Sequence, residues 1–147
     1  MSNAIQLLDT SNDHEIERAF AVFAHLRPHL DGAMFLQRIR TQRTEGFKIV
    51  YIERNGAIVA AAGYRVASFL AWGKVLYIDD LITHPECKRL GLGGSLLDWL
   101  IEEGRRLECD EVHLDTGYSR HDAHRLYLNK GFKLSCHHMN LQLTAHK

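Results

Sequence analysis

The sequence carries no excess charge of either sign, with 18 lysines and arginines against 18 aspartates and glutamates. A chain without a basic field is poorly suited to nucleic acid or to an anionic membrane surface, so we expect neither as a partner. It also contains no apolar run long enough to span a bilayer. The N-terminus lacks the basic start and apolar core of a signal peptide. These absences predict a cytoplasmic protein.

Cysteine is scarce as well, and the three that occur are Cys87, Cys109 and Cys136. Small secreted domains are held by frameworks of paired cysteines. A few cysteines in odd number therefore fit a reducing compartment better than a disulfide scaffold. Internal repeats, low-complexity segments and linkers are also absent, and 147 residues suffice for a sizeable core. We expect a single domain over residues 1–147.

What the chain does contain is an alternation of helical and strand patterns. Apolar residues at helical spacing up to Leu26 predict a helix that Pro28 ends, and Asp31 can cap a second helix. Asn55-Gly56 favours a type I′ hairpin turn, since both central positions need positive φ. We expect an α/β (α+β) fold with a mixed, mostly antiparallel sheet flanked by helices. The expected strands are Ile5–Leu8, Phe47–Arg54, Ala57–Val66, Val75–Thr83, Glu111–Thr116 (parallel to the one before it), Phe132–Leu134 and His137–Leu143, with a loop at Ser68–Lys74 and a last helix at Arg120–Lys130.

The stretch from Leu76 to Leu107 is the one around which the chain is organised. A strand with two adjacent carboxylates, Asp79 and Asp80, leads through a turn containing Pro85 into a basic, glycine-dense loop. An amphipathic helix follows the loop. This order of strand, loop and helix places the loop at the N-terminus of a helix.

The loop itself has the composition of an anion site. The first N–H groups of a helix lack partners within it, and the helix dipole adds partial positive charge there. The glycines Gly91, Gly93 and Gly94 let a ligand approach the backbone. Lys88 and Arg89 would add charge at the mouth. The plain alternative is a strand-to-helix connection that uses its glycines for a tight turn.

Two common phosphate-binding loops do not fit this stretch. A Walker A loop ends in Gly-Lys-Ser/Thr, whereas Gly94 is followed directly by Ser95. A dinucleotide fingerprint needs a third glycine where Leu96 stands, although Glu111 lies at a suitable distance for a ribose-binding acid. That motif would also fall too late in the chain to leave room for a doubly wound domain.

The stretch resembles the acyl-CoA-binding motif of the GNAT superfamily of N-acetyltransferases. The family pattern is Arg/Gln-x-x-Gly-x-Gly/Ala, after a strand ending in a small-apolar triplet and a turn containing proline. Here the triplet is Leu81-Ile82-Thr83 and the loop is Lys88-x-x-Gly91-x-Gly93. A second family element is Ala123-x-x-x-Tyr127-x-x-x-Gly131-Phe132, and the resemblance runs from Val50 to Phe132. The chain departs from the pattern at Lys88 (usually Arg or Gln), Arg89 and Leu90 (commonly Gly and a basic residue) and Arg120 (commonly Asn).

The resemblance implies transfer of an acetyl group from acetyl-CoA to the primary amine of a small molecule or peptide. Acetyl-CoA is then a co-substrate, and the reaction needs no metal. The side chains and backbone implied to bind it are those of Leu81, Ile82, Thr83, Lys88, Arg89, Leu90, Gly91, Leu92, Gly93, Gly94 and Ser95.

This chemistry makes three demands on the protein. The amine must lose a proton, because a free alkyl ammonium has a pKa of about 10. Asp79 or Asp80 is the candidate base; adjacent strand residues point to opposite faces, and a bulge would change which face each takes. The oxyanion needs a donor, for which a backbone N–H of the Leu81–Thr83 strand is the candidate. The leaving thiolate needs a proton, and Tyr127 matches the family's tyrosine as its donor.

Other interpretations of the same residues stay open. Tyr127 could pack the last helix onto the sheet, and either aspartate could pair with an arginine. A non-catalytic acyl-CoA-binding or regulatory module would keep the loop and show no turnover. A metal site needs three or four convergent ligands, and the histidine pairs at 121 and 124 and at 137 and 138 lack the H-E-x-x-H pattern, so we expect no metal. The C-terminal strands could mediate a homodimer.

Overall fold

The computed structural model describes residues 4–117 and 121–145. The chain forms two compact units, Met1–Leu114 and Asp115–Lys147. The expectation of one domain over the whole chain stays a prediction. In the described residues no helix is both long enough and apolar enough to cross a membrane.

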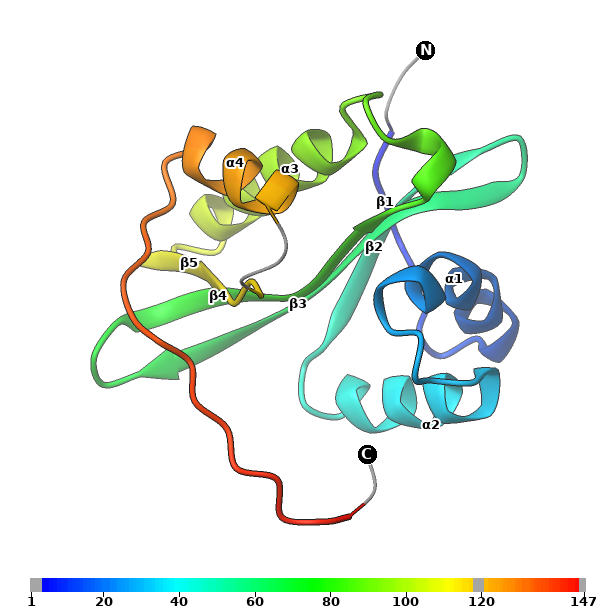
Figure 1. Ribbon diagram of the computed structural model, residues 1–147, viewed down its shortest axis with the longest axis horizontal. Coiled ribbons are helices and arrows are strands. Elements are labelled where there is room, and N and C mark those ends of the chain that lie inside the picture. Colours follow the sequence, from blue (N-terminus) through cyan, green and yellow to red (C-terminus); the bar gives the residue numbers. More distant parts are fainter. Residues whose placement is uncertain (1–3, 118–120, 146–147) are drawn as a thin grey trace. The chain divides into compact units, whose positions relative to one another are not determined.

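The first unit is built on a sheet with the strand order β1-β2-β3-β4-β5 (Figure 1). Neighbouring strands are antiparallel from β1 to β4, and β5 joins β4 in parallel. The expected mixed, mostly antiparallel sheet is thereby confirmed, as is the parallel crossover through a helix. The strands are β1 (Gln6–Leu7), β2 (Lys48–Arg54), β3 (Ala57–Phe69), β4 (Gly73–Thr83) and β5 (Glu111–Leu114).

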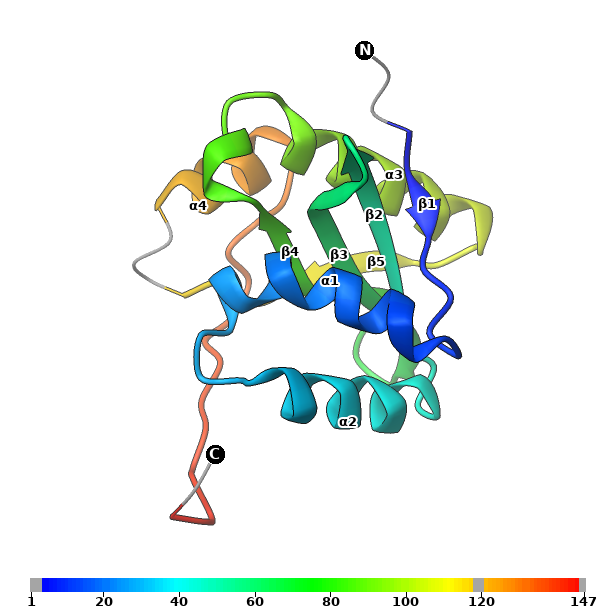
Figure 2. The same cartoon turned by 90° about the vertical axis from the view of Figure 1, so that its right-hand side faces the viewer.

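Helices cover both faces of this sheet. Helices α1 (Asp13–Leu26) and α2 (Gly32–Arg43) lie on one face, and α3 (Leu92–Arg106) lies on the other (Figure 2). A short 3-10 turn, η1 (Pro85–Cys87), connects β4 to the loop before α3. The side chains of Asn12 and Asp31 accept hydrogen bonds from the first N–H groups of α1 and α2, which fixes where both helices begin.

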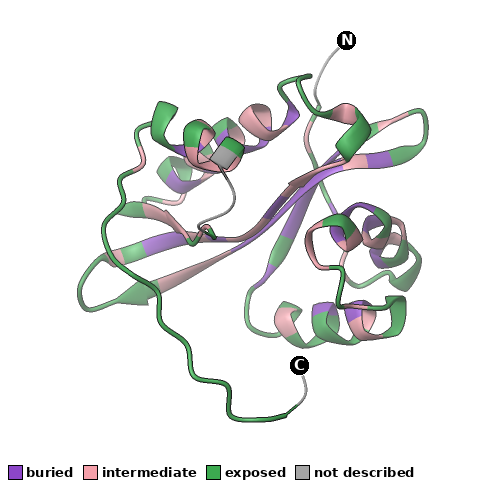
Figure 3. Ribbon diagram, in the orientation of Figure 1, coloured by how far each residue is buried: buried purple, intermediate pink, exposed green. Residues whose placement is uncertain are grey.

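Burial is concentrated on the central strands and on the helix sides that face them (Figure 3). The stretch Ala60 to Gly63 of β3 is buried on both faces of the sheet. Gly63 has a steric reason to be glycine, since a Cβ there would lie 2.2 Å from Cζ of Phe47. The Phe47 ring therefore packs directly on the β3 backbone, in the core shared with α1 and α2.

The two hairpins differ in how well the sequence predicted them. Asn55 and Gly56 both have positive φ, at 52° and 81°, which confirms the type I′ turn. The expected loop at Ser68–Lys74 is wrong, because β3 and β4 remain paired up to Phe69 and Gly73. Aromatic contacts explain the longer ladder: the Trp72 ring lies 5.2 Å from that of Phe69 and 4.3 Å from that of His113 on β5.

The second unit contains helix α4 (His121–Asn129). Gly131, with φ of 97°, follows its end, and the N–H of Phe132 donates to the carbonyl of Tyr127, so a glycine in the left-handed region ends this helix. The expected strands at Phe132–Leu134 and His137–Leu143 are wrong, since both segments lack strand pairing. Their alternating apolar pattern is insufficient without a neighbouring strand to accept their backbone hydrogen bonds. Arg120 lies outside the described residues.

Candidate active site

The site begins where β4 loses one of its two neighbours. The parallel pairing of β4 with β5 covers only Val75 to Ile78, whereas its pairing with β3 continues to Thr83. Among residues 4–114, the stretch from Asp79 to Thr83 therefore has a strand on one side only. It includes the predicted Leu81, Ile82 and Thr83, whose free edge can offer backbone N–H groups to a ligand.

A β-bulge lies at the start of this open stretch. Gly63 pairs with Asp80 and Tyr64 pairs with Ile78, so Asp79 is the extra residue on β4. The bulge breaks the alternation of side chains. The expectation that Asp79 and Asp80 point to opposite faces is wrong, because both carboxylates meet arginines on the side covered by α1 and α2.

Asp79 is held by Arg65 of β3. Arg65 donates from Nε to Oδ1 at 3.1 Å and from Nη2 to Oδ2 at 2.8 Å, a two-point contact that uses both carboxylate oxygens. Burial raises the pKa of Asp79 above its ordinary value, and the two hydrogen bonds from Arg65 act in the opposite direction. Asp79 is thus a partly buried carboxylate that holds its proton to a higher pH than a free aspartate does.

Asp80 is held by Arg27, which follows the last residue of α1. Arg27 donates to Oδ1 of Asp80 from Nε at 2.9 Å and from Nη2 at 2.7 Å. Its Nη2 also donates to the backbone carbonyl of Asp79 at 3.2 Å. Arg27 therefore supports the bulge backbone itself and ties the end of α1 to it.

The end of β4 carries a second link to α1, made by two histidine rings. The centroids of His25 and His84 lie 4.8 Å apart in an edge-to-face arrangement. His84 also accepts the N–H of Glu86 on Nδ1 at 3.1 Å, which shapes the turn into the loop. This pair fixes the direction in which the chain leaves the sheet.

The loop that follows has the backbone of an anion site. Arg89 and Gly91 both have positive φ, at 72° and 76°, and Gly91 is the N-cap residue of α3. Among residues 4–117 and 121–145, no side chain caps this helix, so none of these side chains competes with a ligand for the N–H groups of Leu92, Gly93 and Gly94. Ser95 turns its hydroxyl back to the carbonyl of Gly91 at 3.0 Å.

The two cationic side chains at the loop are also free to contact an anionic ligand. In the part of the chain that the structure describes, Lys88 and Arg89 form no ion pair. The Leu90 side chain between them and the helix is half exposed, at 50%. Two unpaired cations beside uncapped helix N–H groups suit a diphosphate.

Tyr127 lies in the second unit, on α4. Its ring contacts Phe132, with centroids 5.9 Å apart. Asp115 belongs to the same unit, and its Oδ2 lies 3.4 Å from Nδ1 of His138. Among residues 4–117 and 121–145, no three His, Cys, Asp or Glu side chains converge as metal ligands would.

Sequence reasoning left open that an aspartate pairs with an arginine, but it did not identify Arg27 or Arg65 as the partners. Arg27 is 53 residues from Asp80 along the chain, and Arg65 is 14 residues from Asp79. Neither pairing has a local signal, since one depends on where α1 ends in space and the other on the β3–β4 register. The glycine loop, by contrast, was identified from composition alone.

Comparisons with known proteins agree on one family. A family model described as the Acetyltransferase (GNAT) family matches residues 11–132. The uncharacterized N-acetyltransferase YhdJ of Bacillus subtilis is 30% identical over 132 residues, which cover 88% of this chain and 93% of that protein. The aminoalkylphosphonate N-acetyltransferase of Salmonella typhimurium is 32% identical over 83 residues, covering 56% of this chain and 54% of that protein.

A solved structure shares the fold at lower identity. The aminoglycoside N-acetyltransferase AAC(6')-Iy, determined in complex with CoA, superimposes with a TM-score of 0.80 at 13% sequence identity. The match covers 95% of this chain and 93% of that one.

Proposed function

This chain belongs to the GNAT family of acetyltransferases, and from that premise we propose that it moves the acetyl group of acetyl-CoA to a primary amine of a small molecule or peptide. The observation that carries the proposal is the open stretch of β4, where a partly buried carboxylate directly precedes the free strand edge. The uncapped, basic loop follows in the same connection. One segment thus contains candidate residues for binding the acyl group, for taking the proton of the amine and for binding the diphosphate.

Binding of the co-substrate is assigned to the loop and to the strand end. The diphosphate of acetyl-CoA would accept hydrogen bonds from the N–H groups of Leu92, Gly93 and Gly94, with Lys88 and Arg89 at the mouth. The acyl carbonyl would lie at the free edge between Leu81 and Thr83. The residues assigned to the thioester, Leu81 to Thr83, follow Asp79 closely in the sequence. The assignment needs no metal.

The reaction has one proton to remove and one to return. Asp79 takes one proton from the ammonium, directly or through a water, and the free amine nitrogen then attacks the thioester carbon. A backbone N–H at the open β4 edge stabilises the oxyanion. When the C–S bond breaks, the phenol of Tyr127 protonates the sulfur and regains a proton from the former amine nitrogen, directly or through a water. The products are the acetylated amine and CoA.

Asp79 is the better candidate for the base. Its pKa is raised by burial, which brings it closer to the range in which a carboxylate accepts a proton effectively. Asp80 instead spends one oxygen on two hydrogen bonds from Arg27. Replacing Asp79 and Asp80 by Asn, one at a time, tests which of the two is the base.

The test is a screen of amines with acetyl-CoA, read by mass spectrometry as a gain of one acetyl group. Because a relative is named for aminoalkylphosphonates, 2-aminoethylphosphonate comes first, with propylamine as its analogue without the phosphonate. A polyamine and a peptide with a free N-terminus complete the panel. Acetylation by the wild type, lost in Asp79→Asn, is the expected result.

The competing hypothesis is a module that binds acetyl-CoA without using it. It predicts acetyl-CoA binding by calorimetry together with no product from any amine, at any protein concentration. That combination would overturn the proposed function while leaving the loop assignment intact.

A further inference from the structure

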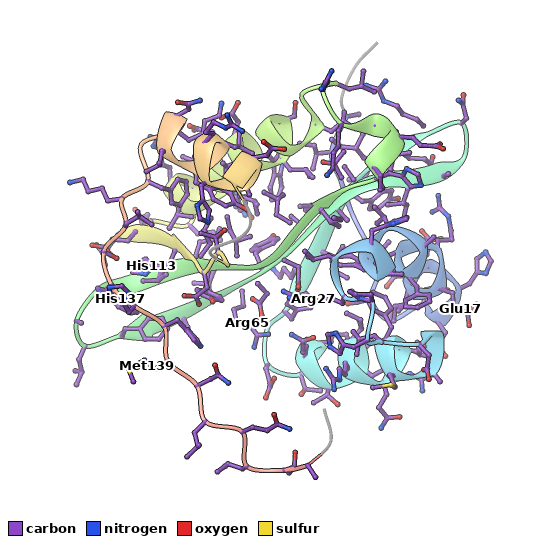
Figure 4. All side chains as sticks on the ribbon, viewed as in Figure 1. Glu17, Arg27, Arg65, His113, His137 and Met139 are labelled. Atoms are coloured by element: carbon purple, nitrogen blue, oxygen red, sulfur yellow. The ribbon has the colours of Figure 1, made fainter. Side chains whose placement is uncertain are left out.

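The two arginines beside the bulge hold their carboxylates in different ways. Arg65 contacts both oxygens of the Asp79 side chain, whereas Arg27 contacts a single oxygen of Asp80 and the Asp79 backbone carbonyl. Figure 4 labels both arginines on the side of the central strands where α1 and α2 lie. One arginine thus orients a carboxylate, and the other supports the backbone that carries it.

The Arg65 guanidinium is itself fixed from two further sides. Its Cζ lies 5.5 Å from the centroid of the Phe47 ring, and its Nη1 lies 3.7 Å from Oε1 of Glu45. The Phe47 ring is held against the β3 backbone by the absence of a Cβ at Gly63. The Arg65 side chain is 23% exposed, against 42% for Arg27. Such support is typical of a group that orients another.

We propose, on the basis of the acetyl transfer inferred above, that Arg65 is a positioning residue, which holds the Asp79 carboxylate in the orientation and charge state in which it takes the proton of the acceptor amine. Each carboxylate oxygen has two lone-pair directions, and Arg65 occupies one on each. The other directions remain for the ammonium proton or for a bridging water. Asp79 is fixed in place and can still accept.

The groups around Asp79 determine what loss of Arg65 does. Arg65 faces it from β3, Arg27 from the end of α1 and Asp80 from β4 itself, while Glu45 faces Arg65 from beyond α2. Burial and the Asp80 charge favour the protonated form of Asp79, and the two arginines favour the ionised form. Without Arg65, Asp79 keeps its proton to higher pH and loses its fixed orientation.

The test compares three variants with the wild type. Arg65→Gln removes the charge and the two-point contact, Arg65→Lys keeps the charge alone, and Arg27→Gln is the matched control on the neighbouring pair. The titration of Asp79 is followed by ¹³C NMR of its carboxyl carbon, assigned with Asp79→Asn. The pH–rate profile is measured with acetyl-CoA and 2-aminoethylphosphonate, propylamine, a polyamine and a peptide.

In Arg65→Gln, we expect both the Asp79 titration and the acidic limb of the rate profile to move to higher pH together. Arg65→Lys should leave the limb nearer its wild-type position and still lower turnover by about tenfold or more, because a misplaced base loses rate even when it is ionised. The Michaelis constant for acetyl-CoA should stay constant. Arg27→Gln should move the Asp79 titration less than Arg65→Gln does.

Two results would overturn the positioning role. In one, the Asp79 titration stays in place in Arg65→Gln. In the other, the titration moves while the rate profile does not, which would make Arg65–Asp79 an ion pair of the fold only. Circular dichroism and thermal melts show whether each variant folds. If Arg65→Gln does not fold, the comparison is made with Arg65→Lys instead. A wild type that acetylates no amine would overturn the transfer itself.

Discussion

At the scale of single residues, Asp79 makes the reaction depend on pH. A base must be ionised to accept a proton, so the rate rises as the pH rises through its pKa. Burial raises that pKa, and the acidic limb of kcat/KM should therefore lie above the ordinary value for aspartate, about 3.9. Asp79→Asn should lower turnover by about 10²–10⁴-fold and remove this limb, with acetyl-CoA affinity nearly constant.

The raised pKa of Asp79 also makes stability depend on pH, in the direction opposite to the rate. A carboxyl with a raised folded-state pKa contributes stability below its unfolded pKa, and this is lost as the pH rises through the folded value. The free energy of unfolding, measured with denaturant between the unfolded-state and folded-state pKa values of Asp79, gives this contribution. If Asp79→Asn retains the wild-type rate profile, the base lies elsewhere, and Asp80→Asn is the next variant to measure.

Tyr127 can be tested by removing its hydroxyl alone. Tyr127→Phe keeps the ring that contacts Phe132, so folding and acetyl-CoA affinity should survive. Turnover should fall toward the low end of about 10²–10⁴-fold, because a thiolate needs less help than an alkoxide. An acetyl donor with a more acidic thiol should restore the rate of the variant. Wild-type turnover with acetyl-CoA itself would make Tyr127 a packing residue.

The sequence identified the carboxylates but not their surroundings. Two adjacent aspartates before a glycine loop are visible in a linear pattern, whereas the bulge that turns both to one side is not. A bulge is a change of register between two strands, and this one lies beside Gly63, on which the Phe47 ring packs. The arginine partners depend on that register in turn.

At the scale of elements, the contact between the Phe47 ring and the β3 backbone at Gly63 can be tested by one substitution that crowds it and a second that makes room. Gly63→Ala places a Cβ 2.2 Å from Cζ of Phe47, and overpacking of this kind should lower the free energy of unfolding by about 1–3 kcal/mol. The double variant Gly63→Ala with Phe47→Leu should recover part of the loss. Gly104→Ala on α3 is the matched control, since its Cβ would lie 3.2 Å from Val112 and helix propensity offsets the crowding. Equal effects in both single variants would contradict this packing.

The loop before α3 allows a test of its backbone conformation. Gly91 has φ of 76°, and a Cβ there would meet nothing within 4 Å, so only the backbone requires glycine. Gly91→Val should therefore weaken CoA binding by about tenfold or more, while Gly91→Asn should retain most of it, because asparagine tolerates the left-handed region. Calorimetry with CoA measures both. Unchanged affinity in the valine variant would remove this loop from the binding site.

At the scale of the whole molecule, the order of elements was predictable and the C-terminal strands were not. Caps, a proline stop and the Asn55-Gly56 turn are local, and each lies where the pattern indicated. A strand such as the one expected at His137–Leu143 would need a partner far away in sequence, which a periodic pattern cannot specify. The homodimer expected from those strands stays a prediction, and sedimentation at several protein concentrations tests it.

The contact between Trp72 and His113 gives the sheet an optical reporter of its own. The chain has two tryptophans, and Trp99 contacts Tyr64 on α3's side of the sheet. In Trp99→Phe, emission would come from Trp72 alone, whose ring lies 4.3 Å from the imidazole on β5. The parallel pairing that holds this imidazole covers only Val75 to Ile78 of β4. Separation of β5 from β4 would therefore change the quenching of Trp72 by His113. Fluorescence can thus follow the opening of the β4–β5 pairing in real time.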